Sequence, residues 1–314
     1  MAEEVKVAYV FPGQGSQKVG MGLDLYVHYA SAKEVYDQVD EVLGFSLSRL
    51  CFEGPEEDLL QTINVQAAVL TTSIACLKAA EEATKYSLPH PTYVLGHSLG
   101  EFTSLVVAGV LSLPDAVRLV RERGRLMHEA GKRKKGGMLA VIGLDLPVVE
   151  NICLSVGTVV SNINSPGQIV ISGAQENLDK ARRLAQIKGA RRVIPLKVSG
   201  AFHSPLMEPA MEGLKNAVND TNFGKPIMPI IANVTAQPLT AIETIKEELI
   251  SQIIHCVKWQ QSVEATITRG VTTFFEIGPG DVLSGLIKRI SPGAQTFNIN
   301  TVESLGEIAN WRKG

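Results

Sequence analysis

Short apolar runs that end near glycine or proline alternate along the chain with longer stretches whose apolar residues recur at helical spacing. Residues 5–11 and 92–95 form two of the short runs and predict buried strands. The longer stretches predict helices over about 23–43, 64–85 and 100–130. Strands that alternate with helices indicate a largely parallel sheet covered by helices on both faces.

The middle of the chain has a different order of elements. The pattern there predicts a strand, a helix, two strands joined at an Asn-Ser-Pro-Gly turn, a second helix and a final strand. This β-α-β-β-α-β order is typical of a ferredoxin-like module. The chain then returns to the larger α/β part, to which we assign two later strands, near 228–233 and 273–277. We therefore expect a large α/β domain of residues 1–130 and 199–314 with a small ferredoxin-like insert of residues 131–198.

Composition limits the classes of function. Of the 314 residues, 45% are apolar and 20% are charged, which is ordinary for a globular protein with a large core. The net charge of -2 gives no overall attraction to nucleic acid or to an anionic membrane. No apolar run approaches the roughly 20 residues that span a bilayer. We expect neither nucleic acid nor membrane as a partner.

The cysteines and the first residues indicate the compartment. Cys51, Cys76, Cys153 and Cys256 lie far apart and form no CxxC pair, so neither a metal site nor a disulfide framework is expected. Reduced thiols fit a cytoplasmic protein. The acidic start of the sequence enters a strand at once and resembles neither a signal peptide nor a transit peptide.

The sequence Gly96-His97-Ser98-Leu99-Gly100 follows the second predicted strand and precedes a long helical pattern. It matches the Gly-x-Ser-x-Gly turn that exposes a nucleophilic serine at the end of a strand. The N–H of Leu99 at the start of the following helix is then a natural donor to an oxyanion. An ordinary glycine-rich turn between strand and helix is the alternative.

Six histidines are candidates for a general base. His97 adjoins the serine, so the turn should direct the two side chains apart, and we interpret it as structural. His255 lies in an apolar helical context that favours core packing. His203 follows a predicted strand and precedes a proline-started helix, in the kind of loop that often carries catalytic residues. It could take the serine proton and return it to a leaving thiol, and a purely structural loop histidine is the open alternative.

Several motifs together resemble one enzyme family. They are Phe11-Pro-Gly-Gln-Gly-Ser-Gln17, Gly96-His-Ser-Leu-Gly-Glu101, Arg123-Gly124, Gly200-Ala-Phe-His-Ser-Pro-Leu206, Gln252 seven residues before Trp259, and Gly278-Pro-Gly280. In kind and order they are similar to the malonyl-CoA:acyl carrier protein transacylases and the acyltransferase domains of fatty acid and polyketide synthases. The resemblance runs from residue 9 to about 290, which is nearly the whole chain.

The resemblance implies a large α/β-hydrolase-like domain with a ferredoxin-like insert. It implies Ser98 as the acylated nucleophile and His203 as its base. It also implies an oxyanion hole from the N–H groups of Gln14 and Leu99, and Gln252 orienting His203 through its side-chain oxygen.

The remaining implied site residues concern the acyl group. Arg123 would hold the malonyl carboxylate, and Asn162 or Asn164 would line the acyl pocket. A planar guanidinium can bind a carboxylate through two parallel hydrogen bonds. Acetyl thioesters would leave that arginine buried and unpaired, which is unfavourable. Without the resemblance, Arg123 would be interpreted as one of several solvated basic residues.

The implied reaction is ping-pong transfer of malonyl from malonyl-CoA to the phosphopantetheine thiol of an acyl carrier protein, with no cofactor and no metal. Basic residues at 132–135, 182–183 and 191–192 are candidates for carrier docking, and a solvated charged surface is the alternative. The family default is a monomer. Two alternative functions stay open: an acyl hydrolase or serine esterase on the same scaffold, and a non-catalytic module that docks a carrier protein.

Overall fold

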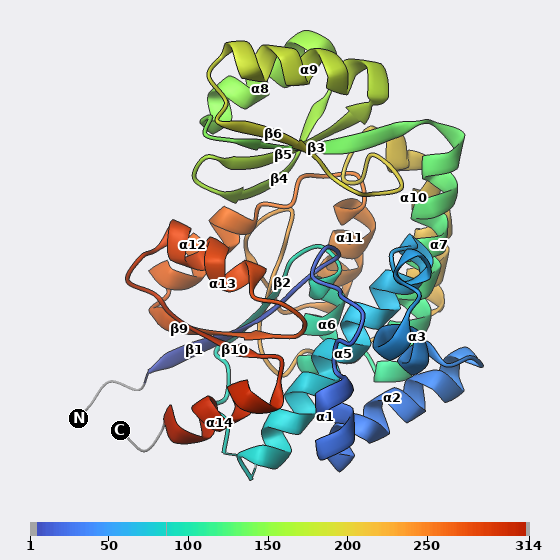
Figure 1. Cartoon of the computed structure of the whole chain (residues 1–314), viewed down its shortest axis with the longest axis vertical. Coiled ribbons are helices and arrows are strands. Elements are labelled where there is room, and N and C mark those ends of the chain that lie inside the picture. The colour runs from blue at the N-terminus through green and yellow to red at the C-terminus, as the bar shows by residue number, and fades with distance from the viewer. Residues whose placement is uncertain (1–4, 86, 312–314) are drawn as a thin grey trace.

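The computed structural model describes residues 5–85 and 87–311, which form two sheets with their helices (Figure 1). The six strands of the larger sheet are β1 (Lys6–Phe11), β2 (Tyr93–Gly96), β7 (Ile230–Ile231), β8 (Pro238–Leu239), β9 (Val271–Ile277) and β10 (Gln295–Ile299). Their order across the sheet is β10-β9-β1-β2-β7-β8. The first five are parallel and β8 pairs antiparallel with β7, so the predicted mainly parallel sheet is confirmed.

Helices pack around this sheet, and those before the smaller sheet differ in part from the prediction. They are α1 (Leu23–His28), α2 (Ala30–Leu43), α3 (Leu47–Glu53), α4 (Glu56–Leu59), α5 (Thr62–Ala83), α6 (Gly100–Val107) and α7 (Leu113–Arg133). The single helix predicted over 100–130 is wrong, because α6 and α7 are separate. Gly109 between them has a left-handed φ of 71°, and Ser112 caps α7 by accepting a hydrogen bond from the N–H of Asp115.

The smaller sheet is antiparallel and lies between the two main parts of the large sheet in the sequence. Its elements in chain order are β3 (Gly136–Ile142), α8 (Leu146–Val156), β4 (Val159–Ser165), β5 (Gln168–Ala174), α9 (Gln175–Ile187) and β6 (Arg192–Pro195). The predicted succession of strands and helices is therefore confirmed. The strands lie in the order β4-β5-β3-β6, with α8 and α9 over the outer face of the sheet (Figure 1).

The last third of the chain returns to the large sheet. It contributes the 3-10 helix η1 (Pro205–Met207) and the helices α10 (Glu208–Asp220), α11 (Ile242–Gln252), α12 (Trp259–Thr268), α13 (Val282–Ile290) and α14 (Val302–Trp311). A short bridge joins the two sheet systems, because the N–H of Ile163 and the N–H of Val257 donate to the backbone oxygens of Val257 and Ser161. This contact holds β4 against the loop that leads from α11 into α12.

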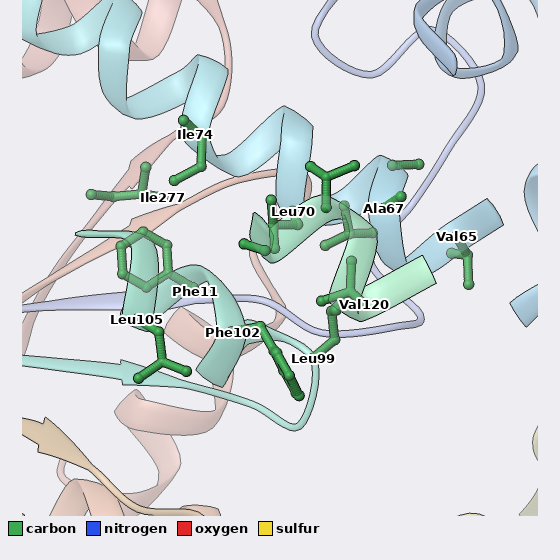
Figure 2. Packing of buried hydrophobic residues seen from close by; sticks show 14 of the residues in the cluster. Phe11, Val65, Ala67, Leu70, Ile74, Leu99, Phe102, Leu105, Val120 and Ile277 are labelled. Carbon is green, nitrogen blue, oxygen red and sulfur yellow. The ribbon is translucent and has the colours of Figure 1, made fainter. Parts of the chain in front are cut away.

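The core is built around α5, which lies between the sheet and the neighbouring helices. Figure 2 shows Leu70 and Ile74 of α5 near Phe11 of β1 and Leu105 of α6, all of them buried. By length and composition α5 is apolar enough to cross a membrane, but 83% of that window is buried inside the protein. Such burial is what a central core helix requires, since each buried apolar side chain contributes about 1.5–3 kcal/mol.

Candidate active site

The turn after β2 is closed by glycines that have no room for a side chain. A Cβ at Gly96 would lie 1.8 Å from the backbone carbon of Gly100, and a Cβ at Gly100 would lie 2.1 Å from the backbone oxygen of Phe11. Ser98 between them has a φ of 51°, which is uncommon for a residue with a side chain. The sequence prediction of a tight turn at this serine is confirmed.

Ser98 and His203 meet although 105 residues separate them. The serine Oγ lies 2.8 Å from Nε2 of His203, and Nδ1 of His203 lies 2.8 Å from the backbone oxygen of Gln252. Because a carbonyl oxygen can only accept, Nδ1 carries the proton and donates it. The Nε2 lone pair therefore faces the serine hydroxyl, as a general base requires.

The expected role for the side chain of Gln252 is wrong. Its main-chain oxygen, and not its side-chain oxygen, accepts the hydrogen bond from His203. Oε1 instead accepts from NH2 of Arg123 at 2.8 Å, and Nε2 donates to the backbone oxygen of Ser98 at 2.9 Å. The sequence indicated the residue, but a pattern of residue types does not distinguish a backbone carbonyl from an amide side chain.

The side chain of Arg123 extends from α7 to the serine, and Arg123 is only 1% exposed. Its NH2 lies 3.2 Å from Ser98 Oγ, while NH1 donates to Oε1 of Gln66 at 2.8 Å. The guanidinium lies over the ring of Phe102, 5.3 Å from its centroid. The interpretation of Arg123 as a solvated residue is therefore excluded, and the amide oxygens of Gln66 and Gln252 hold the guanidinium beside the serine.

Burial shifts the pKa values of both titratable residues beside the serine. It lowers the pKa of Arg123 to about 10, and the nearby Glu101 opposes this shift. Burial, followed by the positive charge of Arg123, lowers the pKa of His203 to about 3. At neutral pH the imidazole is therefore uncharged and able to accept a proton, while the guanidinium stays charged.

Gln14 and Leu99 present free backbone donors near this turn. In residues 5–85 and 87–311, the N–H groups of these two residues donate no hydrogen bond. Leu99 stands directly before α6, at the positive end of the helix dipole. Both N–H groups therefore lack an acceptor within the described part of the chain.

The two asparagines of β4 lie close to the site but contact different partners. Oδ1 of Asn164 lies 2.9 Å from Nε2 of His97, and Oδ1 of Asn162 accepts from Ser161 Oγ. His97, whose pKa is lowered by burial, also lies against Trp259, so its predicted structural role agrees with these contacts. The prediction of core packing for His255 is wrong, because this residue is exposed and its Nδ1 contacts Ser251 of the preceding turn.

Three polar residues of the site were given no role by the sequence. Gln66 lies in the long core helix α5, where a glutamine within an apolar helical pattern was the available signal. Glu101 ends the serine motif, and Asn233 lies in the turn that follows β7. Both are buried, and Asn233 Oδ1 accepts the N–H of Ser98 at 2.7 Å. The sequence holds no local pattern that joins these three positions.

Residues 8–310 match the acyl transferase domain family, and the chain belongs to this family. Among curated proteins it is 45% identical over 305 residues to the malonyl CoA-acyl carrier protein transacylase of Bacillus subtilis (strain 168), covering 96% of this chain and 95% of that protein. It is 41% identical over 313 residues to the enzyme of the same name from Staphylococcus aureus (strain MRSA252), covering 98% and 99%.

Solved structures give the same result. An acyl carrier protein S-malonyltransferase from Vibrio cholerae superposes with a TM-score of 0.92 at 39% identity, covering 96% of this chain and 99% of that one. A malonyl-transacylase solved in complex with its type II PKS acyl-carrier protein superposes with a TM-score of 0.93 at 37% identity, covering 98% and 100%. The family resemblance seen in the sequence motifs is confirmed.

Proposed function

We propose that this protein transfers a malonyl group from malonyl-CoA to the phosphopantetheine thiol of an acyl carrier protein through a malonyl-serine intermediate. It would thereby supply extender units for fatty acid or polyketide synthesis. The observation that carries the proposal is the meeting at Ser98 Oγ of a neutral imidazole 2.8 Å away and a buried guanidinium 3.2 Å away. The transacylase names of the relatives, and the carrier complex of one of them, support the same reaction.

In the first half-reaction, Ser98 Oγ attacks the thioester carbon as its proton passes to Nε2 of His203. The tetrahedral oxyanion accepts hydrogen bonds from the N–H groups of Gln14 and Leu99. When it collapses, the carbon–sulfur bond breaks and the coenzyme A sulfur takes the proton from His203. Malonyl-serine and a free thiol result.

In the second half-reaction, the carrier thiol gives its proton to His203 and its sulfur attacks the serine ester. The same oxyanion donors act, the carbon–oxygen bond breaks, and Ser98 Oγ takes back the proton. A thioester is exchanged for a thioester, so the reaction needs no energy source, cofactor or metal.

Selection of malonyl is assigned to Arg123, whose guanidinium, within the described residues, donates hydrogen bonds to two amide oxygens and the serine oxygen but forms no ion pair. A malonyl carboxylate supplies the missing negative charge, whereas an acetyl group leaves the guanidinium buried beside a methyl group. Asn162 and Asn164 of β4 are proposed to line the same pocket from the smaller sheet.

Docking of an acidic carrier is assigned to exposed basic residues. Those at the end of α7 and on the smaller sheet system are Lys132, Arg133, Lys134, Lys135, Arg182, Arg183, Arg191 and Arg192. Clustered positive charge accelerates and orients the approach of a negatively charged partner. A charge-reversal series at these positions should weaken carrier transfer while leaving serine acylation by malonyl-CoA unchanged.

We also propose the finer description of the fold and of the molecule's setting. Residues 1–130 and 199–314 form an α/β-hydrolase-like catalytic domain, and residues 131–198 form a ferredoxin-like insert. The strand order and the antiparallel pairing of the smaller sheet support this description. We expect a monomer that works in the cytoplasm.

Intact-mass spectrometry after mixing with malonyl-CoA tests the function. The expected result is one malonyl adduct on Ser98 that disappears when an acyl carrier protein bearing phosphopantetheine is added, with malonyl-carrier formed in equal amount. The variant S98A should show no adduct.

Two other outcomes would overturn the proposal. Steady release of free malonate without a carrier would identify an acyl hydrolase. Carrier binding without any adduct would identify a docking module.

A further inference from the structure

Glu101 is a buried acid in the first turn of α6, three residues after the serine, and it is 1% exposed. Its Oε1 accepts the backbone N–H of Asn233 at 3.0 Å, and its Oε2 accepts a short hydrogen bond from Nε2 of Gln252. Buried acids are rare unless they are fully hydrogen bonded, so this residue has a specific structural reason to be there.

The contacts of Glu101 fit its charged form. Burial, and after it the neighbouring carboxyl of Glu248, raise the pKa of Glu101 well above its ordinary value, and the hydrogen bonds from Asn233 and Gln252 offset only part of this rise. The hydrogen-bond geometry nevertheless favours the charged form. Both of its oxygens face N–H donors, so a proton on either oxygen would point at another hydrogen. The helix amino end and the guanidinium of Arg123 add positive potential, and we therefore assign the carboxylate form.

The amide of Gln252 has only one orientation that satisfies its neighbours. Nε2 donates to Glu101 and to the backbone oxygen of Ser98, while Oε1 accepts from Arg123. A flipped amide would set its oxygen against two acceptors and its N–H groups against the guanidinium. The carboxylate thus fixes the amide, and the amide fixes the guanidinium.

Asn233 receives the second contact from Glu101 and closes the serine turn. Its Oδ1 accepts the N–H of Ser98 at 2.7 Å, and its Nδ2 donates to the backbone oxygen of Gly96 at 2.8 Å. The backbone N–H of Asn233 is anchored on Glu101. One carboxylate therefore supports both the malonyl-facing arginine and the backbone that carries the nucleophile.

We propose that Glu101 is a positioning residue that holds Arg123 ready for a substrate carboxylate, through the amide of Gln252. The amide of Gln252 separates the Glu101 carboxylate from the guanidinium of Arg123. The carboxylate therefore stabilises the positive charge of Arg123 without a direct ion pair. This inference rests on the proposed function, because it explains how Arg123 selects malonyl.

The variant E101Q tests it. The amide introduced by E101Q has one oxygen, and this oxygen accepts the hydrogen bond from the backbone N–H of Asn233. Its NH₂ group therefore faces Gln252. Gln252 must then flip and present N–H groups to Arg123. We expect the preference of Ser98 acylation for malonyl-CoA over acetyl-CoA to fall about 10- to 100-fold, which corresponds to one charge-assisted hydrogen bond. Acetylation itself should change far less.

Glu248 offers a matched control. It is also a buried acid, 5% exposed, and its Oε1 accepts the N–H of Val234, the residue next to Asn233. It makes no hydrogen bond to Gln252 or Arg123 within the described chain. E248Q should therefore keep the malonyl preference even if it lowers thermal stability.

The swap variant E101Q/Q252E keeps the original net charge but places a carboxylate in direct contact with Arg123, in place of the neutral amide of Gln252. We expect it to lack the malonyl preference, because the substrate carboxylate would have to displace the introduced carboxylate, and it carries the test if E101Q alone does not fold.

Equal losses of malonyl and acetyl transfer in E101Q, the same loss of preference in E248Q, or full malonyl preference in the folded swap would overturn the inference. If the wild-type enzyme itself shows no preference for malonyl-CoA over acetyl-CoA, the proposed function is refuted instead. The same acylation assay measures this preference on the wild type before any variant is compared.

Discussion

Replacing Arg123 by alanine should convert the enzyme from a malonyl-selective to an acetyl-tolerant acyltransferase. Arg123 is 1% exposed, and its guanidinium contacts two amide oxygens, the serine oxygen and the ring of Phe102. R123A removes the positive charge that a malonyl carboxylate requires. It also removes the buried unpaired charge that an acetyl group would otherwise leave behind.

The size of the effect follows from these contacts. A hydrogen bond to a charged group is worth about 1.5–3 kcal/mol, so a carboxylate held by two of them loses about 3–6 kcal/mol. That is about a 10²- to 10⁴-fold fall in kcat/KM for malonyl-CoA. An acetyl substrate loses at most the single charge-assisted contact from Arg123 to Ser98 Oγ, about 1.5–3 kcal/mol, which is about 10- to 150-fold and about half the loss for malonyl.

Rapid-quench measurement of Ser98 acylation by malonyl-CoA and acetyl-CoA checks the prediction. R121A is the matched control, because Arg121 lies on the same helix but contacts Asn64 and the ring of Phe45 outside the site. A fall in both substrates by the same factor in R123A, or a loss of malonyl preference in R121A, would refute the assignment of selectivity to Arg123.

Three further outcomes are expected. Because the pKa of His203 is lowered to about 3 in the free enzyme, this general base stays uncharged as the pH falls through 6.5. The plot of kcat/KM for malonyl-CoA against pH should therefore show no decline near pH 6.5. The acidic limb of kcat should lie at a higher pH than that of kcat/KM, because a bound malonyl carboxylate offsets the charge of Arg123 that lowers the pKa of His203. A decline of kcat/KM near pH 6.5 contradicts this. G100A places a Cβ 2.1 Å from a backbone oxygen, so acylation by both substrates and the melting temperature should fall, whereas G285A, which has nothing within 4 Å, should leave both nearly unchanged. Q252A keeps the backbone oxygen that holds His203, so the pH profile should stay in place while malonyl preference drops about 10- to 100-fold, and a moved pH profile would show that the amide acts on the histidine.

The sequence predicted well what depends on local pattern. Alternating strands and helices gave the mainly parallel sheet, and the order of elements in the middle of the chain was found as predicted. The division of one predicted helix into α6 and α7 was missed, because apolar periodicity continues across Gly109. Its left-handed conformation ends α6, and a glycine inside a helical pattern does not by itself predict that.

The site was predictable only where a motif carried it. Ser98, His203 and Arg123 were indicated by family motifs, and the structure brings them together. Gln66, Glu101 and Asn233 act through contacts between elements that are remote in the chain. No periodicity or spacing encodes such contacts, since they depend on how α5, α6 and the end of β7 pack.

The choice of amides around Arg123 follows from what the arginine has to do. A carboxylate in direct contact would neutralise the guanidinium, and the substrate carboxylate would have to displace it. An arginine without any support would be costly to bury and free to change its rotamer. The amide oxygens of Gln66 and Gln252 fix the guanidinium in place but leave its charge available, while Glu101 balances that charge from behind Gln252. Selection of a small, singly charged anionic acyl group requires a rigid and incompletely neutralised cation, because any rearrangement on binding would reduce the preference for malonyl.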